Sequence, residues 1–254
     1  MGVPAGFDWE WAKSTGGSLS RRGFLQRLQL IIIIAAQFPS LLQDRNEVAA
    51  GVRGTARLEG GDTLFPTTAM AREAEAHARE VLSPATLEHS YRTYLFGKAL
   101  ARYDRAAVDD EAAFIAAMLH DCGLEQPVTG RCFAVRAAES AERLLTDWGA
   151  APERVIAVRD GIAQHITAGV ERDLSDIAGL LSAGASLDLF GLRWSHCDPD
   201  WICKVVADHP RLDFKNQVIG LVRAEVAAVP DGRTALTYSM GDWEATVRSS
   251  PFAE

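Results

Sequence analysis

The stretch "FIAAMLHDCGL" (residues 114–124) decides the fold of this chain. An apolar helical run leads directly into His120 and Asp121, two groups whose burial is costly unless they are paired, hydrogen-bonded or bound to a metal ion. Gly123 then favours the end of the helix. The pattern therefore predicts a buried helix whose C-terminal end carries an imidazole and a carboxylate into the core.

Helical patterns continue on both sides of this stretch. Pro84 and Pro152 each fall in the first turn of a predicted helix, and Ser83 is the expected N-cap of the first of these. No series of alternating residues predicts a strand, so the expected fold class is all-α. The predicted helices cover residues 68–82, 83–103, 109–120, 133–149, 151–167, 175–191 and 213–229.

Composition limits the partners of the protein. The chain has 254 residues, of which 48% are hydrophobic, so it can bury a full core. Its formal net charge of -8 provides no basic surface to neutralise a phosphate backbone, which argues against a nucleic acid polymer and leaves a single nucleotide open. The four cysteines include no CxxC pair, which favours reduced thiols over a disulfide or a zinc site.

The segment 18–38 has two interpretations. Arg21 and Arg22, followed by an apolar stretch, resemble a twin-arginine export signal. The uninterrupted apolar run, residues 30–36, is far shorter than the ~20 residues that a membrane span needs. We therefore expect a helix that packs on the main domain of a cytoplasmic protein without a stable membrane span. Export through a twin-arginine signal is the alternative.

Ionisable groups recur among apolar neighbours on four of the predicted helices. They are His89, the pair His120 and Asp121, His165, and Asp188. Taken singly, a buried histidine is more often a hydrogen-bonded core residue, and an aspartate near a helix end is more often a cap. If the helices bring these groups to one point, a divalent cation would offset the burial cost of all of them.

The ordered set of His89, His120-Asp121 and Asp188 resembles the signature of the HD-domain superfamily, an all-α fold whose bundled helices carry a metal at the centre. The similarity covers roughly residues 63–242. Its most telling pieces are "LEHSYRTYLFG" (87–97), "AAMLHDCGL" (116–124), "GIAQHI" (161–166) and "HPRLDFK" (209–215). Within the superfamily, "HSYRTYLFG" and the late "DFK" are most similar to the cyanamide hydratase-like branch.

This resemblance implies a domain organisation and a metal site. It implies a helical N-terminal extension (1–62), an HD domain (63–242) and a C-terminal tail (243–254). The implied ligands of a divalent metal are His89, His120, Asp121 and Asp188. Imidazole and carboxylate suit zinc first, with iron or manganese as alternatives. A metal with an open coordination position would activate water near neutral pH and polarise a nitrile or phosphoryl group.

Further residues are assigned to the chemistry around the metal. Asp121 is expected to handle the proton of the water as well, and His165 to act as a general acid or base or to hold a second metal. Lys215 is a cationic candidate for the catalytic pocket, with a surface charge on a buried stem as the alternative. The substrate-binding candidates are Arg92, Ser90 and Glu125.

These three candidates also have other interpretations. Arg92, like Lys215, can be a charge with a buried stem, and Ser90 can bond to the helix backbone instead of the substrate. Glu125 follows the His-Asp pair, where phosphohydrolase members of the superfamily often carry an acidic residue, so it keeps phosphate ester hydrolysis open.

The sequence leaves several functions open. The first is a metal-dependent hydratase or hydrolase of a small molecule, with hydration of cyanamide or another nitrile as the concrete expectation. The second is a phosphohydrolase of nucleotides or small phosphate esters. The third is a di-iron oxygenase of the HD type, since His165 permits a second metal. The fourth is a helical sensor or scaffold, although structural zinc is usually closed by four Cys or His ligands. Residues 238–254 are expected to pack on the core or on a second subunit.

Overall fold

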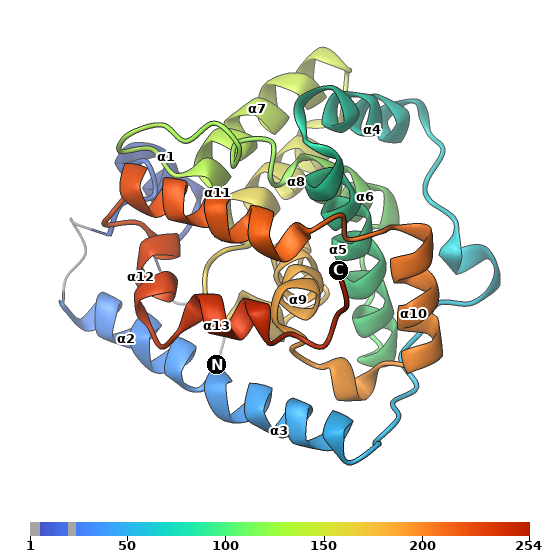
Figure 1. Cartoon of the computed structure of the whole chain (residues 1–254). Coiled ribbons are helices and arrows are strands. Elements are labelled where there is room, and N and C mark those ends of the chain that lie inside the picture. The colour runs from blue at the N-terminus through green and yellow to red at the C-terminus, as the bar shows by residue number, and fades with distance from the viewer. Residues whose placement is uncertain (1–5, 20–23) are drawn as a thin grey trace.

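The computed structural model describes residues 6–19 and 24–254, and within these ranges the elements are helices joined by loops (Figure 1). The all-α prediction is confirmed. The α-helices are α1 (Trp9–Thr15), α2 (Phe24–Ala35), α3 (Gln37–Ala49), α4 (Ala69–Val81), α5 (Pro84–Tyr103), α6 (Asp110–Leu119), α7 (Phe133–Asp147), α8 (Pro152–Gln164), α9 (Ile177–Phe190), α10 (Pro199–Asp208), α11 (Phe214–Ala228), α12 (Arg233–Ser239) and α13 (Trp243–Arg248). Short 3-10 helices cover Gly60–Thr63, Val170–Arg172 and Trp194–His196.

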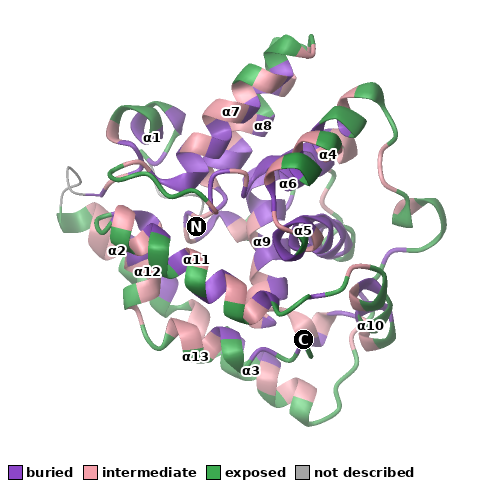
Figure 2. Cartoon of the chain, turned by 45° about the horizontal axis from the view of Figure 1, so that its top comes forward, coloured by how far each residue is buried: buried purple, intermediate pink, exposed green. Residues whose placement is uncertain are grey.

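The centre of the molecule is the crossing of α5 and α9. Figure 2 shows α5 buried along most of its length. The two backbones approach closely at glycines: a Cβ added at Gly184 would lie 2.0 Å from the carbonyl oxygen of Thr93, and one at Gly97 would lie 2.5 Å from that of Leu180. This close approach brings the first half of α5 against the second half of α9.

Helix α6 has the buried character that its sequence predicts. Asp109 caps its N-terminus, because the side chain accepts a hydrogen bond from the backbone N–H of Ala112 at 3.1 Å. Every residue from Ala112 to Leu119 is buried, so the helix passes through the core on all of its faces. Its C-terminal end therefore delivers His120 and Asp121 to the interior.

Both ends of the chain pack on this core. Trp9 of α1 and Leu30 of α2 belong to the same buried cluster as α5, α6 and α9, and so does Phe252 near the C-terminus. Figure 1 shows α2 and α3 running along one side of the molecule near α12 and α13. The described residues of the predicted extension (1–62) and of the predicted tail (243–254) thus contribute to the same core.

The helices α2 and α3 also bear on the interpretation of the N-terminus. The stretch Phe24–Ala49 is long and apolar enough to cross a membrane, with a mean hydropathy of 1.4 in its most apolar window, but this test concerns length and composition alone. A buried core helix or a signal sequence meets the same criterion. Arg21 and Arg22 lie outside the described residues, so export stays a prediction.

Candidate metal site and its cavity

Three of the four predicted ligands meet at one point. His89 comes from α5, His120 ends α6, and Asp121 follows it directly; all three are buried. One ligand atom from each lies within 4.8 Å of the others. Asp121 Oδ2 is 3.3 Å from His120 Nε2 and 3.7 Å from His89 Nε2. This group could hold a metal ion.

The two imidazoles are oriented by hydrogen bonds on their far sides. His120 Nδ1 lies 2.7 Å from the carbonyl oxygen of Ala117, which can only accept, so the proton belongs on Nδ1. The same logic holds for His89 Nδ1, which lies 2.7 Å from Asp188 Oδ2. Each ring therefore turns Nε2 toward Asp121, as a metal-binding histidine does.

The Nε2 atom of His120 is the part of this group that fits a cation best. It is buried and has no hydrogen-bond partner among the described residues. His89 Nε2 has only a long contact with Thr93 Oγ1, at 3.3 Å. Since a buried polar atom without a partner costs free energy, two imidazole nitrogens and a carboxylate facing one another are suited to a shared positive charge.

The charges of His89, His120 and Asp121 also favour a bound cation. Burial alone would raise the pKa of Asp121, but the neighbouring His120 and His89 outweigh burial and hold that pKa well below its usual range, so the carboxylate is ionised. Burial opposes protonation of His120, yet the charge of Asp121 prevails and raises the pKa of this imidazole. A proton and a metal ion therefore compete for the position beside His120 Nε2.

Asp188 has a different position from the one expected of a ligand. Its Oδ1 accepts from Arg92 Nε at 2.9 Å and from Arg211 Nη1 at 2.6 Å, and its Oδ2 accepts from Arg92 Nη2 at 2.9 Å. Together with the His89 contact, these bonds occupy both oxygens. Asp188 therefore orients His89 and lies outside the group of three.

Two predicted substrate-binding residues on α5 are turned away from the site. Arg92 is fully occupied by Asp188 and by the backbone carbonyls of His209 and Pro210, each at 3.0 Å from Nη1. Ser90 Oγ donates to the carbonyl oxygen of Thr86 at 3.2 Å, which is the backbone alternative for this residue. Neither residue lines the cavity described below.

Glu125 and Lys215 also form hydrogen bonds with other segments of the chain instead of facing His89, His120 and Asp121. Glu125 Oε1 accepts from the backbone N–H and the hydroxyl of Ser83, at 3.0 and 2.6 Å, at the start of α5. Lys215 Nζ donates to the carbonyl oxygens of Phe252 at 2.6 Å and Ser250 at 3.1 Å, with a longer contact to that of Arg248. Lys215 thus anchors the C-terminal segment.

A cavity of about 160 Å³ opens beside His89, His120 and Asp121, the three residues called the metal group below. His165 lines it as expected, with its ring centroid 5.1 Å from that of His120. His165 Nδ1 lies 2.6 Å from the carbonyl oxygen of Ile162, so its Nε2 keeps a lone pair. Burial, reinforced by His120, lowers the pKa of His165 to about 3, so this imidazole is neutral near neutral pH.

The remaining walls come from residues that are not candidates for the site in the sequence. The cavity residues that the sequence did not single out include Ile34 and Gln37 from α2–α3, Thr167 after α8, Phe190 at the end of α9, Thr234 of α12 and Trp243 of α13. No lysine or arginine is among the described residues that line the cavity. The walls are mainly apolar, with a few hydroxyl and amide groups and the carboxylate of Glu171, which accepts from Gln37 Nε2 at 2.9 Å and from the backbone N–H of Gly169 at 2.8 Å.

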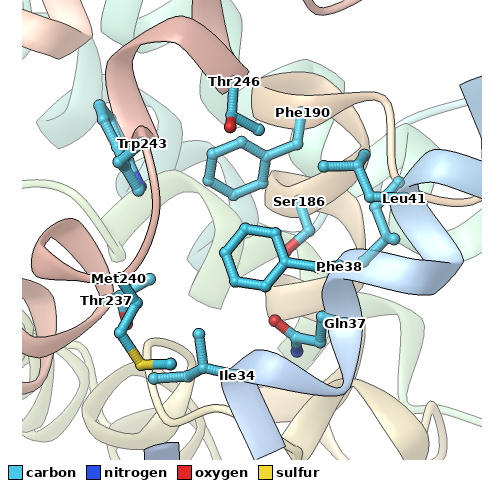
Figure 3. A pocket seen from close by; sticks show the side chains of 11 residues that line it. Ile34, Gln37, Phe38, Leu41, Ser186, Phe190, Thr237, Met240, Trp243 and Thr246 are labelled. Atoms are coloured by element: carbon cyan, nitrogen blue, oxygen red, sulfur yellow. The ribbon is translucent and has the colours of Figure 1, made fainter.

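A smaller pocket of about 70 Å³ adjoins the cavity between α2–α3, α9 and α12–α13. Figure 3 shows the rings of Phe38 and Phe190 facing this space, with Trp243 on one side and Ile34 near its base. Ile34, Phe190 and Trp243 line both spaces, so the pocket extends the cavity toward the two ends of the chain.

No protein-family model matches the chain, and no curated protein matches it in sequence. Functional assignment therefore rests on the buried His89, His120 and Asp121 and on the cavity that they border.

Proposed function

We propose that this protein is a metal-dependent hydrolase or hydratase of the HD-domain superfamily, acting on a small molecule held in the cavity beside His89, His120 and Asp121. The observation that supports this proposal is the buried Nε2 of His120, which has no hydrogen-bond partner among the described residues and faces an ionised carboxylate. A mixed histidine and aspartate set next to a cavity is typical of open, catalytic metal sites, whereas structural zinc is usually closed by four Cys or His ligands.

The surrounding residues have separate tasks in this proposal. A bound divalent ion, zinc first and iron or manganese as alternatives, would lower the pKa of a water molecule and polarise the substrate. Asp188 fixes the ring of His89 so that Nε2 faces the site. Asp121, whose pKa is held well below its usual range, supplies the negative charge that balances the cation.

His165 is the proposed hydrogen-bond acceptor of the cavity. Because burial lowers its pKa to about 3, it is neutral at working pH, and its Nε2 can accept a hydrogen bond from the attacking water or the substrate. A general base works best with a pKa near the operating pH, so the role proposed for His165 is to orient the reacting group and not to remove its proton. The apolar walls of the cavity keep bulk water away from the reacting groups.

The substrate that fits these walls best is a small nitrile, with cyanamide as the concrete candidate. The cavity volume of about 160 Å³ suits a molecule with few heavy atoms. Phosphate esters carry up to two negative charges and are commonly held by arginine or lysine, neither of which is among the described lining residues. Hydration of a nitrile is therefore preferred over phosphate ester hydrolysis.

The test is metal content followed by turnover. Protein purified without a metal-affinity tag is analysed by plasma mass spectrometry, beside His120→Ala and a matched histidine control outside the site, His77→Ala on α4. We expect about one ion per chain in the wild type and in His77→Ala, because the described residues form a single group of this kind, and strong loss in His120→Ala.

Turnover is then measured as urea formed from cyanamide and as phosphate released from a panel of esters. Wild type and His77→Ala should form urea, and His120→Ala should lose this activity together with the metal. Release of phosphate without urea would select the phosphohydrolase alternative. Full metal content in His120→Ala, or activity in metal-free protein, would contradict the proposed site.

A further inference from the structure

A second buried group near the cavity has no partner for its charge. Arg233, the first residue of α12, is 2% exposed. Its Nη1 donates to Thr167 Oγ1, but Nε and Nη2 are buried without a hydrogen-bond partner among the described residues. Arginine stays protonated in proteins, so Arg233 brings a full positive charge into the interior.

The neighbours of Arg233 do not neutralise this charge. The guanidinium carbon lies 5.2 Å from the ring centroid of Trp11, a contact that stabilises a cation without accepting its N–H protons in the guanidinium plane. Burial lowers the pKa of Arg233, and the nearby thiol of Cys132 only partly opposes this. Burial also raises the pKa of Cys132, so the thiol is neutral and a weak acceptor. No described carboxylate forms an ion pair with Arg233, whereas the equally buried Arg92 and Arg211 both bind Asp188.

Arg92 shows what the unpaired edge of Arg233 can bind. The same two atoms of Arg92, Nε and Nη2, each donate to one oxygen of Asp188 at 2.9 Å. This fork of two parallel N–H groups is the arrangement that matches a carboxylate. Arg233 presents the same fork, equally buried, without an acid to fill it.

The wall of the cavity connects Arg233 with the space beside the metal group. Thr167, which accepts from Arg233, lines the cavity two residues after His165. Thr234, which follows Arg233 in α12, also lines the cavity, and its buried hydroxyl oxygen has no partner among the described residues. Two hydroxyl groups therefore face this side of the cavity, and the buried guanidinium of Arg233, which does not itself line the cavity, lies directly behind Thr167.

We infer that this corner, formed by Arg233, Thr167 and Thr234, binds a carboxylate group of the substrate. The inference rests on the proposed function and narrows its substrate class, from small nitriles such as cyanamide to small nitriles that also carry one carboxylate, with the nitrile beside His89, His120 and Asp121. One guanidinium matches one negative charge, and the two hydroxyls can share the remaining lone pairs of a carboxylate. A phosphate dianion would leave a second charge without a partner.

The test measures carboxylate binding by thermal unfolding of metal-free protein, so that a metal ion cannot hold the probe. Sodium acetate is the probe, with acetamide as its neutral counterpart and sodium chloride at equal ionic strength. We expect the unfolding temperature of the wild type to rise with acetate concentration, as it does when a ligand binds the folded state, and to stay unchanged with the other two.

The variants separate a binding role from a structural role. Arg233→Met should abolish the response to acetate, and it should not unfold at a lower temperature than the wild type without acetate, because it removes a buried charge that lacks a partner. Thr167→Val should weaken the response. Thr237→Val is the matched control, since Thr237 lines the same cavity but its hydroxyl is bonded to the backbone carbonyl of Arg233.

Several outcomes would overturn the inference. These are a wild type that does not respond to acetate, an equal response in Arg233→Met, and equal shifts with chloride or inorganic phosphate. If Arg233→Met does not fold, Thr167→Val decides, and an undiminished acetate response in that variant counts against the corner. Because the protein is metal-free in this test, an acetate response would stand even if metal analysis refuted the proposed function. Likewise, the absence of an acetate response would not refute the metal site.

Discussion

At the scale of single residues, Asp188 shows how a buried charge can stabilise a site without binding at its centre. Its carboxylate is enclosed by two arginines and a histidine, so the ionic groups of α5 and α9 are fixed relative to one another. Burial alone would raise the pKa of Asp188, but Arg92 and Arg211 outweigh it and hold that pKa far below its usual range. Ionised Asp188 therefore stabilises the folded protein.

The sign of the pH dependence follows from this lowered pKa. In the unfolded chain the pKa of an aspartate is about 4. The stabilising contribution of Asp188 is therefore complete above that pH, and it is lost as the pH falls toward the lower pKa of the folded state. We expect Asp188→Asn to lose about 3–5 kcal/mol in the free energy of unfolding at neutral pH, because it leaves two buried arginines without their partner.

Urea unfolding across the acid range measures this difference. The gap between wild type and Asp188→Asn should narrow as the pH falls below about 4, since only the wild type loses the ionised carboxylate. Asp173→Asn is the control: this exposed aspartate bonds to Ser175, and its replacement should change stability far less. If the stability difference between wild type and Asp188→Asn did not narrow at acid pH, the conclusion that ionised Asp188 stabilises the fold would be refuted.

At the scale of elements, the crossing of α5 and α9 sets the geometry of the site. Gly184→Ala would place a methyl group 2.0 Å from the backbone oxygen of Thr93, which lies in the same helix as His89. Because neither backbone can yield without separating the helices, we expect a loss of about 1–3 kcal/mol in stability, together with weaker metal binding.

Gly220→Ala in α11 is the matched control for this substitution. A Cβ at Gly220 meets nothing within 4 Å, so alanine should stabilise the helix by about 0.5–1 kcal/mol through its lower backbone entropy in the unfolded chain. Chemical denaturation and metal analysis of the two variants provide the comparison. Equal stability changes of the same sign would show that the helix crossing is not the sensitive point.

Most of the core helices were predictable because their signals are local, whereas α1, α3, α12 and α13 were not predicted from the sequence. Helix α6 is buried on every face from Ala112 onward and leads into His120 and Asp121, so its burial and the position of these two groups in the core could be predicted locally. The roles expected for Lys215 and Arg92 could not be tested locally. The partners of Lys215 are carbonyl oxygens more than thirty residues further along the chain, and Arg92 meets an aspartate 96 residues away. Those pairings depend on how the helices pack.

The corner around Arg233 was missed for a related reason. In the sequence Arg233 is one arginine near a glycine, with no neighbour that suggests burial, and only the packing of α12 against Thr167 and Trp11 reveals its free edge. Ile34 and Trp243 were missed for the same reason. Each is an apolar residue that lines the cavity only because the chain brings it against segments far away in the sequence.

At the scale of the whole molecule, the two ends of the chain complete the structure. Lys215 holds the C-terminal segment through three backbone carbonyls, and Phe252 packs against Trp194 with ring centroids 4.6 Å apart. The segment before it carries Trp243, which lines the cavity. The C-terminal end is therefore part of the enclosure of the site.

We expect Lys215→Met to loosen this end without removing a reacting group. The variant leaves its carbonyl partners without a donor, so stability should fall by about 1 kcal/mol and carboxypeptidase should remove the last residues faster. The metal content should not change, and turnover should change little. A large fall in kcat with unchanged resistance to carboxypeptidase would instead support the catalytic role predicted from the sequence.

The position of the cavity between the two ends of the chain also orders events during synthesis on the ribosome. His89, His120 and Asp121 are translated before Trp243, a wall residue that lies 122 residues after Asp121. The proposed metal ligands thus leave the ribosome well before the chamber that borders them can close. Under the proposed function, a nascent chain would bind its ion through the open side, and the enclosed space for a substrate would exist only after α13 has been made.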